Sequence, residues 1–505
     1  MLELFWYLLH PYVLLKFVFM NRFKACLLCV IVIVAACTPK KETGASITIT
    51  VTGKSDSVLF ELRNRDLQLG YEKTDAAASV LTDTSGTAQF NVALDAPGNY
   101  VITADGLKSL MLYLQPGMDI SISLDERDKT IAPQFSGNGA IYQEAIYNLR
   151  TDLKIFNVMD MMRLEPEVLD SMLLASTAQG DELAEKLKPS FTDIPEFDQM
   201  IKAWVVSQKA EVLERYPDYY QYFNGKNPAY IPDSTAQRWV DFLSYADVGL
   251  KIQGYRNNVS TYLDYLTTKK RDEMIESGVH KDSITYEKYQ AMKFEIASGV
   301  EHAGLRELMM ATDIMTRMNF MELTNVEPQL RDFKTAYPTS RYVAPLDKFF
   351  AKTENLKPGK PAIEFTGLTV EGEKKSIKDY VGKVVYVDVW ATWCGPCRAE
   401  FPHAKTLKEE FKDNKDVVFM YVSIDDGQKE WKTYLEKDPE FKGEHLYAEG
   451  AWNSDICNEY LISGIPRYML IDKQGNISTA DAPRPSSGEK IRASINALLT
   501  AEPNS

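Results

Sequence analysis

The sequence predicts a multidomain protein with three folded regions in succession: a small antiparallel β domain, an α-helical middle domain and a C-terminal α/β domain. The chain has 505 residues, enough for about three domains at roughly 100–200 residues each. The spacing of apolar residues changes twice, from alternation at every second residue, to a helical spacing, to fully apolar strands between helices. We place the three regions at residues 46–137, 138–353 and 357–503.

The composition is that of a globular protein without a surface for nucleic acid. Apolar residues make up 45% of the chain and charged residues 25%. The 57 Lys and Arg against 71 Asp and Glu give a net charge of −14. Binding to DNA or RNA depends on clustered positive charge, and no basic cluster interrupts the acidic excess. We therefore expect no nucleic-acid partner.

An apolar segment near the N-terminus has the length of a secretory signal. Residues 25–36 are apolar and follow a short basic segment. They are too few to span a bilayer as a helix but suit the central region of a signal peptide. The segment ends in Val34-Ala35-Ala36-Cys37, which resembles a bacterial lipobox.

These features predict an N-terminal lipid anchor. We expect a signal peptide over residues 1–36 with the working start at Met20, a lipidated Cys37 and a tether over residues 37–45. The upstream apolar stretch Leu4–Phe19 leaves a membrane helix as the alternative.

Period-two alternation predicts half-buried strands in the first region. Alternating runs occupy residues 47–52, 88–95 and 120–124. Turn sequences rich in Gly, Pro, Asp and Asn occupy residues 83–86, 96–99 and 115–117. This spacing is typical of a small antiparallel sandwich or barrel. The region pairs no nucleophile with a base, so we expect it to be structural or to contact other proteins.

Helical spacing defines the middle region. Val259, Tyr262, Leu263 and Leu266 fall on one helical face. The region is expected to be a helical bundle whose aromatic and Met side chains fill the core. The charged stretch Lys352–Lys360, which contains Pro358-Gly359, is interpreted as the linker to the last region.

The last region alternates strands with helices. We predict strands at residues 384–390, 417–424, 445–448 and 468–471, and helices at residues 397–411, 428–435 and 489–499. Fully apolar strands between helices predict a sheet that is covered on both faces.

The cysteines indicate chemistry or metal binding. Six are present; Cys26 and Cys29 lie in the expected signal peptide, and lipidation would use Cys37. Two of the remaining three form a C-x-x-C pair, Cys394 and Cys397. A tetrahedral zinc site needs four donors, and no second pair of ligands is present, so we expect no metal.

The C-x-x-C pair lies where a buried strand is expected to end and a helix to begin. A thiol at a helix N-terminus faces unpaired amide N–H groups and the positive end of the helix dipole, which favour the thiolate. Cys394 is therefore the candidate nucleophile. Cys397, three residues later and inside the first turn, is the candidate resolving thiol.

Residues 387–402, which include Trp393-Cys394-Gly395-Pro396-Cys397, resemble the active-site segment of thioredoxin-like proteins, most closely the membrane-anchored TlpA/ResA type. Residues 358–365 are similar to the leading hairpin of that type, and Gly464-Ile465-Pro466 stands where the family places a cis-proline. The resemblance covers roughly residues 357–500 and implies a thioredoxin fold. The order of regions resembles that of multidomain thiol-disulfide oxidoreductases of Bacteroidota.

The resemblance assigns roles to further residues. Asp388 is expected to be a buried carboxylate with a raised pKa that accepts the proton of Cys397, its alternative being an ordinary polar group of the strand. Pro466 and the neighbouring Ile465 would receive an extended substrate chain. Trp393 would shield the disulfide or contact substrate, unless it serves only in packing.

Four other residues of this region also enter the interpretation. The intervening pair Gly395-Pro396 matches the reducing members of the superfamily. His403 is either a second proton carrier or part of a solvated helix face. Cys457 is either a buried small residue or a third redox thiol.

The predicted function is that of an envelope thiol-disulfide oxidoreductase without a cofactor other than its own Cys394–Cys397 disulfide. Its partners would be disulfide-bearing envelope proteins and a membrane electron donor. It would be anchored at Cys37 and face the periplasm, in either the inner or the outer membrane. The alternatives are a lipid-anchored binding or scaffold protein that acts through its upstream domains, and a thiol peroxidase, which would need a pocket that activates peroxide.

Overall fold

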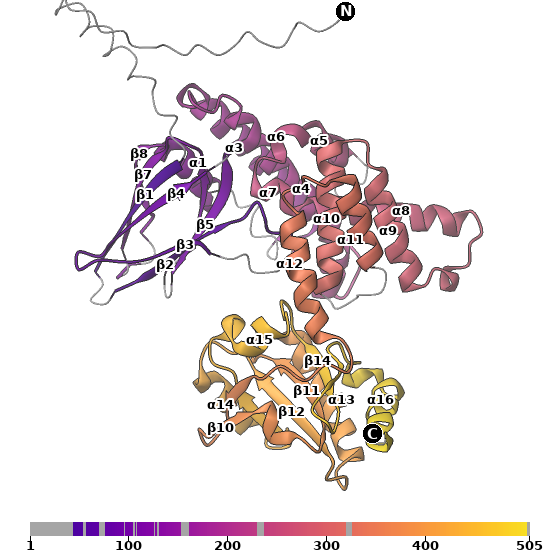
Figure 1. Cartoon of the computed structure of the whole chain (residues 1–505). Helices are drawn as coiled ribbons and strands as arrows, with labels where there is room; N and C mark the ends of the chain where they lie inside the picture. Colours follow the sequence, from indigo (N-terminus) through magenta and orange to yellow (C-terminus); the bar gives the residue numbers. More distant parts are fainter. Residues whose placement is uncertain are drawn as a thin grey trace, which may run out of the picture.

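Three parts of different secondary structure follow one another along the chain (Figure 1). The computed structural model describes residues 44–53, 57–69, 76–94, 96–104, 107, 109–125, 127–128, 131–152, 161–229, 237–319 and 326–501. The expected signal peptide, most of the tether and the expected lipidation site at Cys37 lie outside these residues. Within them, no helix combines the length and apolar character needed to cross a membrane.

The first part consists of two four-stranded sheets. Its strands are β1 (Gly44–Thr52), β2 (Leu59–Asn64), β3 (Ala76–Leu81), β4 (Thr87–Ala93), β5 (Gly98–Ala104), β6 (Leu110–Leu114), β7 (Asp119–Asp125) and β8 (Gln134–Asn138). The strand orders are β4-β1-β7-β8 and β3-β2-β5-β6. Burial alternates along β1, so that Ile47, Ile49 and Val51 lie in the core while the threonines between them are half-buried or exposed.

The expectation of a purely antiparallel β domain is wrong at one pair of strands. β1 runs parallel to β7, with Ser46 opposite Asp119 and Thr52 opposite Asp125. The other pairs in these two sheets are antiparallel. Alternating apolar residues determine which face of a strand is buried but carry no information on the direction of its neighbour.

The middle part is helical. Its helices are α1 (Ala140–Asp152), α3 (Pro166–Leu187), α4 (Phe197–Asn224), α5 (Gln237–Ser244), α6 (Ala246–Gly249), α7 (Gln253–Asn257), α8 (Val259–Glu276), α9 (Tyr286–Gly299), α10 (Ala303–Asn319), α11 (Val326–Ala336) and α12 (Val343–Thr353), with short 3-10 turns η3 (Lys188–Ser190), η4 (Lys281–Ser283) and η5 (Glu354–Leu356). Aromatic rings fill its core, as expected from the sequence; Phe242 stacks on Tyr255 with ring centroids 4.1 Å apart.

A buried ion pair joins the β-sheet part to the helical part. Asp66, which follows β2, accepts hydrogen bonds from Arg256 of α7 and from the side chain of Asn99 on β5. The Arg256 side chain is 3% exposed and that of Asp66 8%. Asn99 also donates to the carbonyl of Lys251 at 3.0 Å, and Arg256 donates to the hydroxyl of Tyr342 at 3.2 Å. These bonds tie the β3-β2-β5-β6 sheet to the helices around α7.

The C-terminal part is built on a seven-stranded mixed sheet. Its strands are β9 (Thr366–Leu368), β10 (Lys374–Ser376), β11 (Val384–Trp390), β12 (Val417–Ser423), β13 (Glu444–Tyr447), β14 (Arg467–Ile471) and β15 (Ile477–Thr479); its helices are α13 (Gly395–Glu410), α14 (Gln428–Lys437), α15 (Asp455–Glu459) and α16 (Glu489–Thr500), with 3-10 turns η6 (Ile377–Tyr380), η7 (Ala451–Asn453) and η8 (Pro485–Ser487). The strand order is β10-β9-β13-β12-β11-β14-β15. Every residue of β11 is buried.

Helices cover both faces of this sheet, which explains why its central strands are apolar at consecutive positions. α13 and α16 lie on one face and α14 on the other (Figure 1). β11 runs parallel to β12 and antiparallel to β14. The carboxyl end of β11 therefore lies beside the start of β14, and this edge carries the residues expected to act.

The stretch expected to link the middle and C-terminal parts is helical in its first half. α12 continues to Thr353, and η5 follows directly and ends at Leu356, which is 1% exposed. The apolar residues Leu346, Phe349 and Leu356 anchor this segment, while its lysines point outward and suggested an extended linker.

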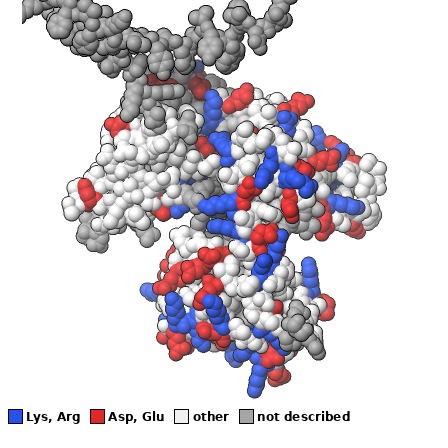
Figure 2. Space-filling view, viewed as in Figure 1, with Lys and Arg blue, Asp and Glu red and all other residues white. Residues whose placement is uncertain are grey.

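Charged side chains are distributed unevenly over the face of the molecule shown in Figure 2. The β-sheet part shows few of them, whereas Lys and Arg alternate with Asp and Glu over the helical and C-terminal parts. On the helical and C-terminal parts of this face, charges of the two signs are interspersed.

Candidate active site

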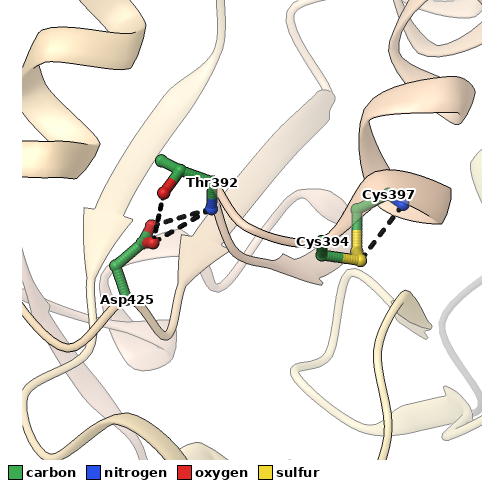
Figure 3. Close-up of a disulfide and its surroundings, with 4 residues drawn as sticks. All are labelled: Thr392, Cys394, Cys397 and Asp425. Carbon is green, nitrogen blue, oxygen red and sulfur yellow. Dashed lines mark hydrogen bonds between the residues drawn. A yellow bond between two sulfur atoms is a disulfide. The ribbon is translucent and has the colours of Figure 1, made fainter. Parts of the chain in front are cut away.

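The two cysteines of the C-x-x-C pair form a disulfide at the start of α13 (Figure 3). Their Cα atoms are 5.3 Å apart. Cys394 is the N-cap residue of the helix, and its Sγ accepts a hydrogen bond from the backbone N–H of Cys397 at 3.1 Å. A negative sulfur at this position would be stabilised by that N–H and by the helix dipole. Cys394 thus occupies the position expected of a nucleophile.

The two cysteines are buried, whereas the residues next to them are exposed to solvent. Cys394 is 4% exposed and Cys397 is fully buried. Trp393, Gly395 and Pro396 around them are exposed, Trp393 by 51%. A partner sulfur can approach Cys394 from this rim. Cys397 is buried in the first turn of α13, which suits it to the role of the resolving thiol.

Asp388 is a buried carboxyl group without a hydrogen-bond partner among the described residues. It lies on β11 opposite Tyr421 of β12 and Tyr468 of β14, and it is 1% exposed. Within the described part of the chain, neither of its two carboxyl oxygens has a hydrogen-bond partner. Burial raises the pKa of Asp388 well above its usual value, and the charge of Glu400 raises it further. The direction of this pKa shift agrees with the expectation from the sequence.

Glu400 is the second buried carboxylate near the disulfide, one turn after Cys397 on α13. It accepts hydrogen bonds from the backbone N–H and the hydroxyl of Ser486, both at 2.9 Å. These bonds fasten α13 to η8. They also explain how Glu400 tolerates burial, because two donors compensate its charge, whereas no described residue donates to Asp388.

Asp425 was not anticipated from the sequence, although it fixes the loop that leads into Cys394 (Figure 3). It is 2% exposed and follows β12. Its carboxylate accepts the backbone N–H of Thr392 at 3.0 and 3.1 Å, the hydroxyl of Thr392 at 2.6 Å and the hydroxyl of Ser423 at 2.7 Å. A signal was available, because a polar residue directly after a buried parallel strand lies at the edge where the neighbouring strand also ends.

Of the predicted substrate-binding residues, Ile465 and Pro466 directly precede β14, whose first residue pairs with Val389 near the end of β11. The peptide bond between Ile465 and Pro466 is cis, and both residues are half-buried. Trp393 packs near Trp452 of η7, with ring centroids 6.0 Å apart. Trp393 therefore has a packing partner while half of its surface is open to a ligand.

The remaining candidates lie away from this constellation or are hidden. His403 is exposed on α13. Cys457 is buried on α15. In the part of the chain that the structure describes, no group of three or more His, Cys, Asp or Glu side chains is arranged to hold a metal ion.

The region that contains the disulfide is similar in sequence to known proteins. A family model described as thioredoxin-like matches residues 382–477. The thiol-disulfide oxidoreductase ResA of Bacillus cereus is 32% identical over 129 residues, which make up 26% of this chain and 72% of the relative. The chain belongs to this family of thiol-disulfide oxidoreductases. The thioredoxin-like protein YneN of Bacillus subtilis is 35% identical over 128 residues, which make up 25% of this chain and 72% of the relative.

A solved structure from Bacteroides vulgatus, provisionally described as a thiol-disulfide oxidoreductase, shares 43% identity. The similarity covers 29% of this chain and 99% of that chain, with a TM-score of 0.26.

Membership makes the protein an oxidoreductase with a thioredoxin-like fold in its C-terminal region. The predicted resemblance to the TlpA/ResA type is confirmed. The segment matched by the family model contains Asp388, Cys394, Cys397 and Pro466. The ResA and YneN matches each cover about a quarter of this chain.

Proposed function

We propose that this thiol-disulfide oxidoreductase reduces or exchanges disulfides in extracytoplasmic proteins through a Cys394–Cys397 dithiol/disulfide cycle. The observation that supports the proposal is the disulfide itself, placed at the N-terminus of α13 with Cys394 next to an exposed rim and Cys397 buried behind it. The intervening Gly395-Pro396 pair, typical of reducing members of the superfamily, supports the reducing direction.

The cycle starts from the dithiol form. The Cys394 thiolate attacks one sulfur of the substrate disulfide, and the other substrate sulfur leaves as a thiolate. The resulting mixed disulfide is broken when Cys397, deprotonated, attacks Sγ of Cys394. The second substrate sulfur then leaves and is protonated. Two electrons have passed to the substrate, and the enzyme holds the Cys394–Cys397 disulfide.

Asp388 is suited to handle the proton of Cys397 in the second step. A carboxyl group in water is too acidic to accept a thiol proton, but the raised pKa of Asp388 brings its proton affinity closer to that of a thiol. Ile465 and Pro466 would hold the substrate backbone while the exchange takes place, because Pro466 has no N–H and leaves the neighbouring backbone groups to the substrate.

We further propose that the enzyme needs no cofactor other than its own disulfide and that a membrane-bound two-electron donor returns it to the dithiol form. The expected lipid anchor at Cys37 would keep the enzyme beside such a donor, with its catalytic region in the periplasm. The lipobox-like sequence supports this location.

Trapping of the mixed disulfide tests the proposal. Cys397→Ser removes the resolving thiol, so substrates should remain attached to Cys394 after the cells are quenched with acid. Cys394→Ser is the matched control, because it keeps the second thiol but lacks the nucleophile. We expect a discrete set of cysteine-containing envelope proteins in the first variant only. The absence of adducts above the control would overturn the proposal.

A further inference from the structure

A pocket of about 400 Å³ lies directly beside the proposed substrate-binding proline. Its walls come from the segment that contains Pro466 and from residues 481–484, which follow β15. An extended substrate chain held at Pro466 would therefore pass this pocket with the residues next to its reactive cysteine.

Arg467, the residue after Pro466, places a buried guanidinium group in the pocket wall. The residue is 6% exposed. One of its terminal nitrogens donates to the carbonyl of Asn319, the last residue of α10, at 3.3 Å, and the other lies 3.6 Å from a carboxyl oxygen of Asp481. Its Nε has no hydrogen-bond partner among the described residues.

The charge of Arg467 is only partly compensated. Burial lowers the pKa of Arg467, because the guanidinium has lost much of its contact with water. The Asp481 side chain is 56% exposed, so water weakens its attraction for the guanidinium. A buried cation whose charge is only partly compensated favours an anionic group in the adjoining pocket.

The other charged residues of the wall leave an excess of positive charge. Arg467 and Arg484 contribute two cations and Asp481 one anion, and the remaining residues of the wall carry no ionised group at neutral pH. A carboxylate matches this arrangement best, because its two oxygens can accept hydrogen bonds from a guanidinium in one plane. A lysine or arginine of a substrate would be repelled.

We propose that this pocket binds an acidic side chain of the substrate, so that the preferred substrates are disulfides in which an Asp or Glu lies within a few residues of the reactive cysteine. The inference rests on the proposed function, because it assumes that a polypeptide disulfide is reduced at Cys394. It names a substrate class and makes Arg467 a specificity-determining residue.

Matched peptides test the inference with the reduced full-length protein. Each peptide carries one cysteine in a disulfide with a common reporter thiol. The two members of a pair differ at a single position, which holds Glu in one and Gln in the other, and the pairs place this position one or two residues before or after the cysteine. The second-order rate constant is measured for each. We expect the Glu peptide to react at least about fivefold faster at one position, and high salt to reduce this ratio.

Two variants locate the effect. In Arg467→Gln and, to a lesser degree, in Arg484→Gln, the Glu/Gln ratio should fall toward one. Arg492→Gln is the matched control, since Arg492 lies on α16 outside the pocket and should keep the ratio of the unmodified protein. If Arg467→Gln does not fold, the inference is still tested by three measurements: the Glu/Gln rate ratio of the unmodified protein, the salt dependence of that ratio, and the ratio in Arg484→Gln.

An uncharged small disulfide, hydroxyethyl disulfide, separates this inference from the proposed function. Reduction of this compound together with a Glu/Gln ratio of one in the unmodified protein would overturn the acidic pocket and leave the redox cycle standing. Failure to reduce either the peptides or hydroxyethyl disulfide would overturn the proposed function itself. A ratio that is unchanged in both Arg467→Gln and Arg484→Gln would also contradict the pocket.

Discussion

The unpartnered carboxyl of Asp388 should make the stability of the C-terminal region depend on pH. Folding raises the pKa of Asp388, so the folded chain binds the proton more tightly than the unfolded chain does. The contribution of this group to stability is therefore fully present below the unfolded pKa and is lost as the pH rises toward the folded pKa. The loss amounts to about 1.4 kcal/mol for each pH unit in that window.

Asp388→Asn removes this titration with little change in shape. The variant should gain on the unmodified protein by about 1 kcal/mol with each pH unit inside the window, so the difference in stability between them should widen as the pH rises. The assay is urea unfolding of the oxidised full-length protein at pH 5 to 8, in which hydrogen exchange detected by mass spectrometry reports the unfolding. Peptides from β11 report on the C-terminal region alone, since a multidomain chain need not unfold as one unit.

Asp425→Asn is the matched control on the adjacent strand end. Asp425 is as buried as Asp388, but its carboxylate accepts three donors from Thr392 and Ser423. Loss of a negative charge that is hydrogen-bonded should destabilise the region at neutral pH by about 1–3 kcal/mol. Parallel pH curves for the unmodified protein and Asp388→Asn would refute the reasoning, because they would mean that folding does not alter the proton affinity of Asp388.

Three further predictions concern other contacts. Thr392→Val removes the 2.6 Å hydroxyl bond to Asp425 and keeps the N–H bonds, so urea unfolding of the C-terminal region should show a loss of about 1–2 kcal/mol; no loss would mean that the hydroxyl does not fix the loop. Arg256→Met leaves Asp66 buried without its cation and should lower the free energy of unfolding, measured by calorimetry, by about 3–5 kcal/mol. Adding Asp66→Asn to this variant should restore part of the lost stability. No restoration would contradict the ion pair. Cys457→Ala should reduce hydroxyethyl disulfide at a rate within about twofold of the unmodified protein, because a buried thiol is inert, and a larger drop would give Cys457 a redox role.

The sequence predicted the central elements of the C-terminal region well because they are regular and apolar. The strand expected at residues 384–390 is β11 in the structure, and the expected helix after Cys394 is α13. The C-x-x-C motif identified both cysteines because its spacing and its position between strand and helix are local properties. The direction of β7 relative to β1 was missed, since strand pairing depends on the path of the whole chain.

The parts of the site that sequence reasoning missed are contacts between distant segments. Asp425 reaches Thr392 over 33 residues, and Glu400 reaches Ser486 over 86. Arg467 meets Asn319 across two regions of the chain. A short polar residue or a single arginine gives no periodic signal, so its partner becomes visible only when the strands and helices that carry both are placed in space.

The helical connection between the middle and C-terminal regions restricts how the enzyme can meet its partners. A Gly- and Ser-rich connection would let the redox centre sweep through a large volume and collide with partners on several sides. Here α12 and η5 run without interruption to the buried Leu356, which sets the distance and direction of the disulfide relative to the upstream body. In the proposed cycle, a client and an electron donor would use the same approach to Cys394 in turn, and each would block the other while it is bound. Turnover should follow ping-pong kinetics, with excess client acting as a competitive inhibitor of re-reduction.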